Sequence, residues 1–191
     1  MGKINVLGFD IANLIAAGEV VDRPASVVKE LCENALDAGA TSVTVEIRHG
    51  GTSFIRVSDN GVGIDSEDMP LTVLRHATSK ISTAEDLQSI GTLGFRGEAL
   101  AAIAAVCKMK MLSKTADSHM GTSMTCEGGE IIDITEAGCA KGTTVVAAEL
   151  FYNVPARRKF LKKDASECAA ITAVMEKMAL SAPGVAMKYI T

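Results

Sequence analysis

The sequence predicts an α+β fold, with hairpin-connected strands on one side and helices on the other. Two amphipathic helical patterns, Val27 to Gly39 and Ser166 to Leu180, account for the main helices. Short alternating or β-branched runs, separated by glycine turns, fill most of the chain between them. With 191 residues, of which 48% are hydrophobic, the chain can bury one core, and we expect a single domain over residues 1–191.

Composition excludes several classes of protein. Lys and Arg total 19 against 23 Asp and Glu, so the formal charge of −4 argues against a chain that mainly grips nucleic acid through a basic surface. The five cysteines include no C-x-x-C pair, which excludes a zinc spacing and a disulfide framework and suits a reducing compartment. No signal peptide and no apolar run long enough to cross a bilayer is visible, so we expect a cytoplasmic protein without membrane contact.

The first third of the chain is predicted as an arm, a helix and a hairpin. The apolar segment Ile11–Val21 is either a short helix or an arm that seeks a partner surface. Asp22 is a candidate N-cap for the helix that follows, Pro24 fits its first turn, and Gly39 ends it. The hairpin is predicted as a strand at 42–48, a Gly-Gly turn and a returning strand from 54 that runs into Asp59.

The remaining elements alternate less regularly. Residues 66–91 are typical of a mobile loop region, with a short helix at 71–77. Residues 99–106 are Ala-rich and apolar almost all round, which predicts a buried helix. Further strands are predicted at 108–113, 122–126, 131–134, 143–149 and 185–190. The last helix, at 166–180, places Ile171, Val174, Met175 and Met178 on one stripe.

Two polar residues of the first helix are candidates for chemistry. Glu30 and Asn34 lie one turn apart, at the border between the apolar and polar arcs of the helix. A border position can face a cleft, whereas Glu33 lies further into the polar arc, where side chains usually face water. The geometry therefore favours Glu30 over Glu33 as a reactive carboxylate, although an ordinary solvated face explains this helix alone more simply.

Three glycine motifs could approach a ligand. Asp59-Asn60-Gly61-Val62-Gly63 is either a tight turn or a strand end whose carboxylate accepts a hydrogen bond from an amine such as that of adenine. Gly94-Phe95-Arg96-Gly97 is either the glycine-rich start of a buried helix or an anion site of backbone N–H groups. Gly142-Thr143-Thr144 is a weaker signal at a strand start. P-loop, complete dinucleotide-binding and H-E-x-x-H motifs are absent.

The order of these motifs resembles the GHKL superfamily of ATPases: E-x-x-x-N on a helix, D-x-G-x-G after a strand, G-x-x-G before a helix and G-T-T on a strand. Four longer stretches resemble the MutL family of DNA mismatch repair proteins, namely IANLIAAGEVVDRPASVVKELCENALDAGAT, RHATSKI, LGFRGEAL and LFYNVPARRKF. The resemblance covers nearly the whole chain. It implies a two-layer α/β sandwich of the GHKL or Bergerat type, with a mixed, mostly antiparallel sheet and helices on one face.

The resemblance also implies a role for each matching residue. Glu30 would be the general base for the attacking water, and Asn34 would ligate a Mg²⁺ that bridges the phosphates of ATP. Asp59 would bind the adenine amine, with Gly63 near the base and Thr143 supporting it through water. The other nucleotide contacts would come from a lid with Thr78, Ser79 and Lys80, and from the phosphate loop Gly94, Phe95, Arg96, Gly97 and Glu98.

At the level of the protein, the resemblance implies slow ATP hydrolysis that works as a conformational switch. Residues 1–22 would form a dimerisation arm, of which Ile15–Val20 crosses to a second subunit when ATP binds. The implied partners are a second copy of the chain, mismatch-recognition and downstream repair proteins, and DNA bound weakly and non-specifically. The family's second domain, which contributes a lysine to the γ-phosphate, and its C-terminal domain are absent from residues 1–191, so we expect a fragment.

Two other functions remain open from the sequence. The chain could hold nucleotide and present a dimer surface without measurable hydrolysis, because the lysine of the second domain is missing. It could also be a histidine-kinase catalytic domain, against which the LGFRGEAL and PARRKF stretches argue. The basic run Arg157–Lys163 is either a DNA-facing patch or a solvated loop.

Overall fold

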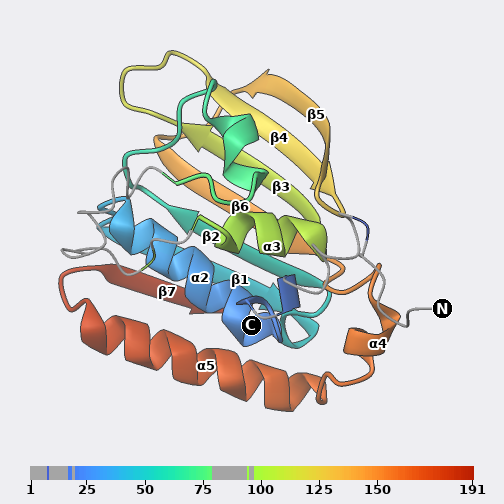
Figure 1. Ribbon diagram of the computed structural model, residues 1–191. Helices are drawn as coiled ribbons and strands as arrows, with labels where there is room; N and C mark the ends of the chain where they lie inside the picture. The colour runs from blue at the N-terminus through green and yellow to red at the C-terminus, as the bar shows by residue number, and fades with distance from the viewer. Residues whose placement is uncertain (1–7, 9–16, 19, 79–93, 95–96) are drawn as a thin grey trace, which may run out of the picture.

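The computed structural model describes residues 8, 17, 18, 20–78, 94 and 97–191, which form a sheet layer and a helix layer (Figure 1). The helices α2, α3 and α5 all cover the same face of the sheet. The seven strands are antiparallel to their neighbours, except that β1 and β7 run parallel. This arrangement confirms the predicted two-layer sandwich with a mixed, mostly antiparallel sheet.

The sheet has the strand order β5-β4-β3-β6-β2-β1-β7. Its strands are β1 (Ser42–Arg48), β2 (Phe54–Asp59), β3 (Lys108–Lys114), β4 (Gly121–Glu127), β5 (Glu130–Ala137), β6 (Gly142–Ala148) and β7 (Ala186–Ile190). Every predicted strand is present, with small differences at the ends. Because β2 and β6 are antiparallel neighbours, the C-terminal end of β2 lies beside the N-terminal end of β6. This topology brings Asp59 close to Thr143.

The helix layer places α2 between α3 and α5 (Figure 1). The helical elements are α2 (Pro24–Asp37), α3 (Ala99–Ala105), α4 (Pro155–Arg158) and α5 (Asp164–Ser181), with 3-10 turns η1 (His49–Gly51) and η2 (Met69–Val73). The predicted stripe of α5 is largely confirmed, because Ile171, Met175 and Met178 are buried. Within the described ranges, no helix combines the length and apolar character that a membrane crossing needs.

The core lies between the two layers. Val43, Val45 and Ile47 alternate along β1 and are at most 2% exposed. They join Val28 and Leu31 of α2 in one hydrophobic cluster. Each such side chain contributes about 1.5–3 kcal/mol when fully buried. The period of two in β1 and the apolar arc of α2 therefore fix which face of each element points inward, and the polar arc of α2 is directed away from the sheet.

Two local predictions are wrong. The N-cap of α2 is Arg23, whose extended backbone carries no side-chain cap, and Asp22 instead accepts a hydrogen bond from the Ser26 hydroxyl. Pro24 occupies the first turn as predicted, so the helix starts one residue too late for Asp22 to cap it. The short helix predicted at 71–77 is the 3-10 turn η2, which begins earlier and ends at Val73.

Candidate nucleotide-binding site

Helix α2 sets the length of the candidate site. Glu30, Asn34 and Asp37 follow one another at i, i+4 and i+7, so they share one side of the helix. Just beyond the helix, the Ala38 carbonyl accepts a hydrogen bond of 3.0 Å from the Val62 N–H in the loop after β2. Because an α-helix rises about 1.5 Å per residue, Glu30 lies about 12 Å along the axis from this contact. One rigid element therefore fixes both ends of the site.

The Asp59 carboxylate is oriented by two backbone N–H groups. Gly61 donates to Oδ1 at 2.8 Å and Thr143 donates to the same oxygen at 3.3 Å. Burial raises the pKa of Asp59, and these two hydrogen bonds only partly offset that effect. Both bonds end on Oδ1, and no donor within the described part of the chain reaches Oδ2. Oδ2 is thus the oxygen that can accept a hydrogen bond from a ligand.

The two glycines of the Asp59 loop are required by packing. A Cβ on Gly61 would lie 2.7 Å from the Ala38 carbonyl oxygen at the end of α2. Gly63 has a positive φ of 82°, and a Cβ there would lie 2.1 Å from the Lys114 carbonyl oxygen at the end of β3. The loop is therefore clamped between α2 and β3. This packing explains the spacing of the glycines, and it leaves Asp59 as the candidate ligand-binding residue of the motif.

Glu33 is less exposed than the sequence pattern predicted. The Glu30 side chain is 25% exposed and that of Glu33 only 14%, so the expectation that Glu33 faces water is wrong. Both carboxylates pair with Lys29, whose ammonium group lies 2.8 Å from Glu33 and 3.3 Å from Glu30. Burial alone would lower the pKa of Lys29, but its bonds and attraction to the two carboxylates outweigh burial and raise it. Glu33 is the more closely paired carboxylate, which still favours Glu30 as the reactive one.

The described residues of the Gly94–Glu98 loop contact α2 and the segment before the predicted lid. The Gly94 N–H donates to Asp37 Oδ2 at 3.2 Å, which ties the start of the loop to the exposed side of α2. Gly97 has a φ of 62°, and a Cβ there would lie 2.5 Å from the Ala77 carbonyl oxygen and 3.0 Å from Thr78 Cβ. The second glycine of the loop thus allows close approach of the segment that contains the predicted lid residue Thr78.

Glu98 is engaged by two basic side chains. Its carboxylate lies 3.2 Å from Arg75 and 3.2 Å from His76. Its carbonyl accepts a hydrogen bond of 2.8 Å from the Ala102 N–H in the first turn of α3. The Glu98 side chain therefore joins the segment before the lid to the start of α3.

The structure brings Asp59, Gly63 and Thr143 together at one end of α2 and Gly94 beside Asp37. The predicted residues Ser79, Lys80, Phe95 and Arg96, and most of the N-terminal arm, lie outside the described residues. The sequence reasoning missed Asp37, although its i+3 spacing from Asn34 was a usable signal. It also missed Ser113, a buried strand serine for which the sequence pattern offers no signal.

Comparison with known proteins identifies the fold family. Residues 22–136, more than half of the chain, match the family model described as histidine kinase-, DNA gyrase B- and HSP90-like ATPase. The matched range contains the Glu30 helix, the Asp59 loop and the Gly94–Glu98 loop. The chain belongs to the histidine kinase-, DNA gyrase B- and HSP90-like ATPase family.

Within this ATPase family, the predicted resemblance to MutL is confirmed. The DNA mismatch repair protein MutL of Caldanaerobacter subterraneus subsp. tengcongensis is 51% identical over 190 residues, which are 100% of this chain and 32% of the relative. MutL of Opitutus terrae is 50% identical over 190 residues, which are 100% of this chain and 30% of the relative. The chain thus spans about a third of the length of these curated relatives.

Solved structures agree with this placement of the ATPase domain. The Aquifex aeolicus MutL ATPase domain complexed with ADP has a TM-score of 0.72 at 36% identity, covering 90% of this chain and 60% of that chain. The N-terminal domain of a DNA repair protein has a TM-score of 0.78 at 28% identity, covering 93% of this chain and 51% of that chain. The chain is a MutL-type ATPase domain in fold and sequence.

The partial burial of the Asp59 carboxylate predicts that Asp59→Asn stabilises the nucleotide-free ATPase domain. Since burial raises the pKa of Asp59 in the folded state, ionisation opposes folding above the ordinary carboxyl pKa of about 3.9, and protonation at lower pH relieves this cost. An amide oxygen can still accept both N–H groups. We expect a higher melting temperature for the variant at neutral pH and a difference that shrinks as the pH falls toward about 4. Thermal melts across this pH range measure the effect.

The matched control is Asp117→Asn, which neutralises an exposed carboxylate far along the chain. This control should leave the pH profile of the melting temperature unchanged. A neutral-pH melting temperature of Asp59→Asn at or below that of the wild type would contradict the prediction.

Proposed function

We propose that the chain binds ATP along helix α2 and hydrolyses it slowly, as the switch domain of a MutL-type mismatch repair protein. The observation that supports this most directly is the placement of a partly buried acceptor, Asp59 Oδ2, beside the C-terminal end of α2 and of a carboxylate, Glu30, about two turns earlier, near the middle of the helix. The adenine amine donates to Asp59, and the triphosphate extends along α2 toward Glu30. The related Aquifex aeolicus domain, solved with ADP, is consistent with a nucleotide at this site.

Glu30 acts as the general base in this proposal. Its carboxylate accepts a proton from the water that attacks the γ-phosphate. The Lys29 ammonium lies 3.3 Å from the Glu30 carboxylate and places a positive charge beside it. Glu33 stays in its closer ion pair with Lys29 at 2.8 Å. The two carboxylates of α2 thus divide into a base and a partner for the lysine.

Asn34 fits the role of a magnesium ligand. Mg²⁺ prefers oxygen donors and is usually held by one or two protein groups together with substrate phosphates. Across the described residues, no group of three or more His, Cys, Asp or Glu could hold a metal on its own. A single amide oxygen on the nucleotide side of α2 therefore suits an ion that arrives with ATP. When bound, Mg²⁺ neutralises charge on the phosphates.

Replacing the base should separate binding from turnover. We expect Glu30→Gln to lower the rate of phosphate release by about 10²- to 10⁴-fold, because general-base catalysis contributes about that much. ATP affinity should stay nearly unchanged, since the adenine-binding end of the site is about 12 Å from Glu30 along the helix. Phosphate release is measured on the 191-residue chain and on a longer chain that includes the second domain.

Glu33→Gln is the matched control, because it removes the same charge one turn away on the same helix. It should retain most of the turnover. Equal losses in the two variants, or full turnover in Glu30→Gln, would show that Glu30 is not the base.

We further propose that the N-terminal arm mediates ATP-dependent dimerisation, which coordinates mismatch-recognition and downstream repair proteins. The described end of the arm is held by the PARR segment. Arg157 Nη1 donates to the Val21 carbonyl at 3.0 Å. A Cβ on Gly18 would lie 1.0 Å from the Arg157 guanidinium, so a side chain at this position would force Arg157 to move away from the arm. The contact links the arm, just before α2, to Arg157 of α4. We also expect the protein to be cytoplasmic.

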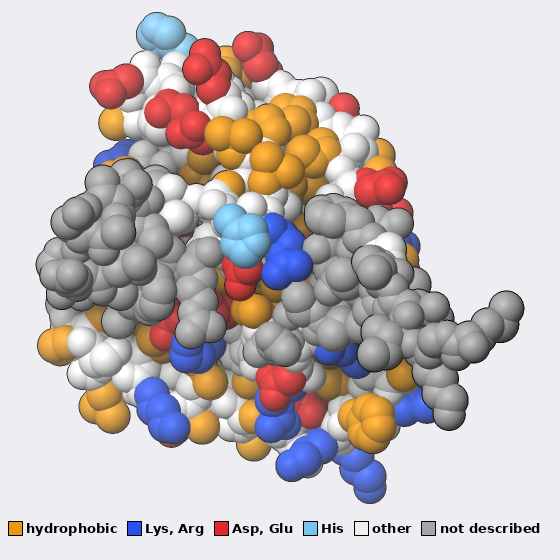
Figure 2. Space-filling view, in the orientation of Figure 1, with side chains coloured by type: hydrophobic (Ala, Val, Ile, Leu, Met, Phe, Trp, Pro, Cys, Tyr) orange, Lys and Arg blue, Asp and Glu red, His pale blue; other side chains and the backbone are white. Residues whose placement is uncertain are grey.

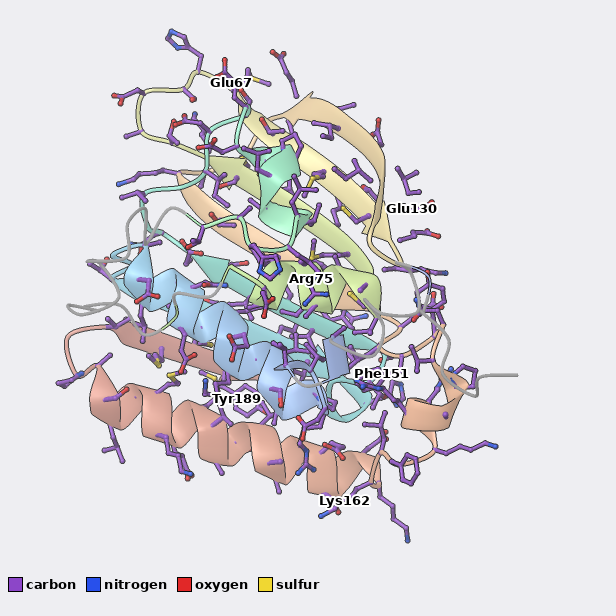
Figure 3. All side chains as sticks on the ribbon, viewed as in Figure 1. Glu67, Arg75, Glu130, Phe151, Lys162 and Tyr189 are labelled. Atoms are coloured by element: carbon purple, nitrogen blue, oxygen red, sulfur yellow. The ribbon has the colours of Figure 1, made fainter. Side chains whose placement is uncertain are left out.

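Weak, non-specific DNA binding is proposed for the basic run between α4 and α5. Lys and Arg side chains gather along the lower edge of the molecule in Figure 2, and Figure 3 places Lys162 at this edge, at the start of α5. The buried Glu167 holds the run in place, because it accepts from the Lys162 N–H at 2.9 Å and pairs with Arg23 at 2.9 Å. The exposed members of the run are Arg158, Lys159, Phe160, Lys162 and Lys163. Their charges are directed toward solvent, where a phosphate backbone could meet them.

Removing these charges should weaken DNA binding and its salt dependence. We expect replacement of Arg158, Lys159, Lys162 and Lys163 by Ala to reduce the slope of log K against log salt by about 0.9 for each duplex phosphate that the variant no longer neutralises. Fluorescence anisotropy with duplex DNA at several salt concentrations measures the slope. The control carries the same change in charge at four other exposed lysines, Lys110, Lys141, Lys177 and Lys188. Similar slopes for the two quadruple variants would exclude a localised DNA site.

A further inference from the structure

Ser113 is a buried residue whose hydroxyl joins three segments at the adenine-binding end of the proposed site. It lies on β3, opposite Thr143 of β6, and is 1% exposed. The Ile64 N–H donates to Ser113 Oγ at 2.9 Å, and Ser113 Oγ donates to the Gly142 carbonyl at 3.1 Å. Ser113 Oγ also lies 2.8 Å from Thr143 Oγ1. The hydroxyl therefore touches the loop after Asp59 and the start of β6 at the same time.

The direction of the bond between Ser113 and Thr143 can be assigned from the proton balance of Ser113. A serine hydroxyl has one proton to donate and two lone pairs to accept with. Ser113 gives its proton to the Gly142 carbonyl and accepts the Ile64 N–H. With that proton assigned to the Gly142 carbonyl, the remaining lone pair of Ser113 can only accept, so in this assignment Thr143 donates its hydroxyl proton to Ser113. The Thr143 hydroxyl can then act toward a ligand only as a hydrogen-bond acceptor.

We propose that Ser113 is a positioning residue that leaves only hydrogen-bond acceptors at the adenine-binding end of the site. Ser113 thereby selects adenine over guanine nucleotides. This inference rests on the proposed ATP site. Asp59 Oδ2 and Thr143 Oγ1 lie on residues joined by the 3.3 Å bond between Thr143 N–H and Asp59 Oδ1. Adenine presents an exocyclic amine, which donates, where guanine presents a carbonyl oxygen, which accepts. Two acceptors facing that position favour the amine, directly or through one water, and reject the carbonyl.

The same hydroxyl also holds the Asp59 loop at its far side. Ile64 follows Gly63, whose backbone is pressed against the Lys114 carbonyl, so the loop has contacts with both Ser113 and its neighbour on β3. Without the Ser113 hydroxyl, Thr143 could rotate its proton outward and become a donor to the base. Loss of Ser113 should therefore weaken the binding of adenine nucleotides and relax the discrimination against guanine nucleotides.

The test compares ATP and GTP binding to Ser113→Ala and to the wild-type 191-residue chain, by competition with a fluorescent ATP analogue. We expect the ATP dissociation constant to rise about tenfold, as for loss of one or two hydrogen bonds, while the GTP constant changes much less. The ATP:GTP preference then falls about tenfold. Ser113→Thr, which keeps a hydroxyl, should retain the preference, and Ser113→Cys, which keeps the size but is a weak donor, should lose it.

Thr122→Val is the matched control, because Thr122 is the cross-strand neighbour of Ser113 on β4 and is also buried, at 7% exposed. It should keep the wild-type preference. An unchanged ATP:GTP ratio in both Ser113→Ala and Ser113→Cys, or an equal loss of ATP and GTP affinity in the two variants, would overturn the role of Ser113. A wild-type chain that binds no ATP would instead overturn the proposed function itself.

Discussion

The candidate site depends on the contact between the end of helix α2 and the loop after β2. Val62 donates to the Ala38 carbonyl at 3.0 Å, and the space beside that carbonyl leaves no room for a side chain on Gly61. Asn60 adds a second anchor, since its Oδ1 accepts the Thr41 N–H and the Ser42 N–H at 2.9 Å each. The helix end, the start of β1 and the end of β2 are thereby locked together. Because α2 is rigid, this lock also fixes where Glu30 stands relative to Asp59.

The strand order brings together the residues at the adenine-binding end of the proposed site. Asp59 and Thr143 are 84 residues apart in the sequence, yet they meet because β2 and β6 are antiparallel neighbours. β3 lies on the other side of β6 and brings Ser113 into the same cluster of hydrogen bonds. Ser113, Thr143 and Asp59 Oδ1 are joined by hydrogen bonds, which favours a unique arrangement of the site before any ligand enters. Because these acceptors are already in place, little further ordering of the protein is needed when a ligand binds.

Much of this structure could be predicted from local patterns. The alternation of Val43, Val45 and Ile47 placed β1, and the apolar arc of α2 identified its buried face. The position of Asp59 at a strand end was also readable from the sequence. The residues of the nucleotide site were assigned through resemblance to a family, because a polar helix face and a glycine turn are each explained equally well without a ligand.

The failures have physical causes that a single sequence does not display. Glu33 pairs with Lys29 one turn earlier on the same helix, and the rotamers that allow this pair are not encoded in the periodicity. Asp22 is not the N-cap because α2 begins at Pro24, which makes Arg23 the N-cap residue. The function of Ser113 depends on strand order, since only the pairing of β3 with β6 sets it beside Thr143. Long-range pairing is what turns an ordinary strand serine into part of a site.

The most direct test of the α2-spanning site is a crystal structure of the chain with Mg²⁺ and a non-hydrolysable ATP analogue. We predict that the adenine amine donates to Asp59 Oδ2, that Asn34 contacts the metal, and that the γ-phosphate lies beside Glu30. A nucleotide bound in the opposite direction along α2, or with its base away from Asp59, would contradict the site described above.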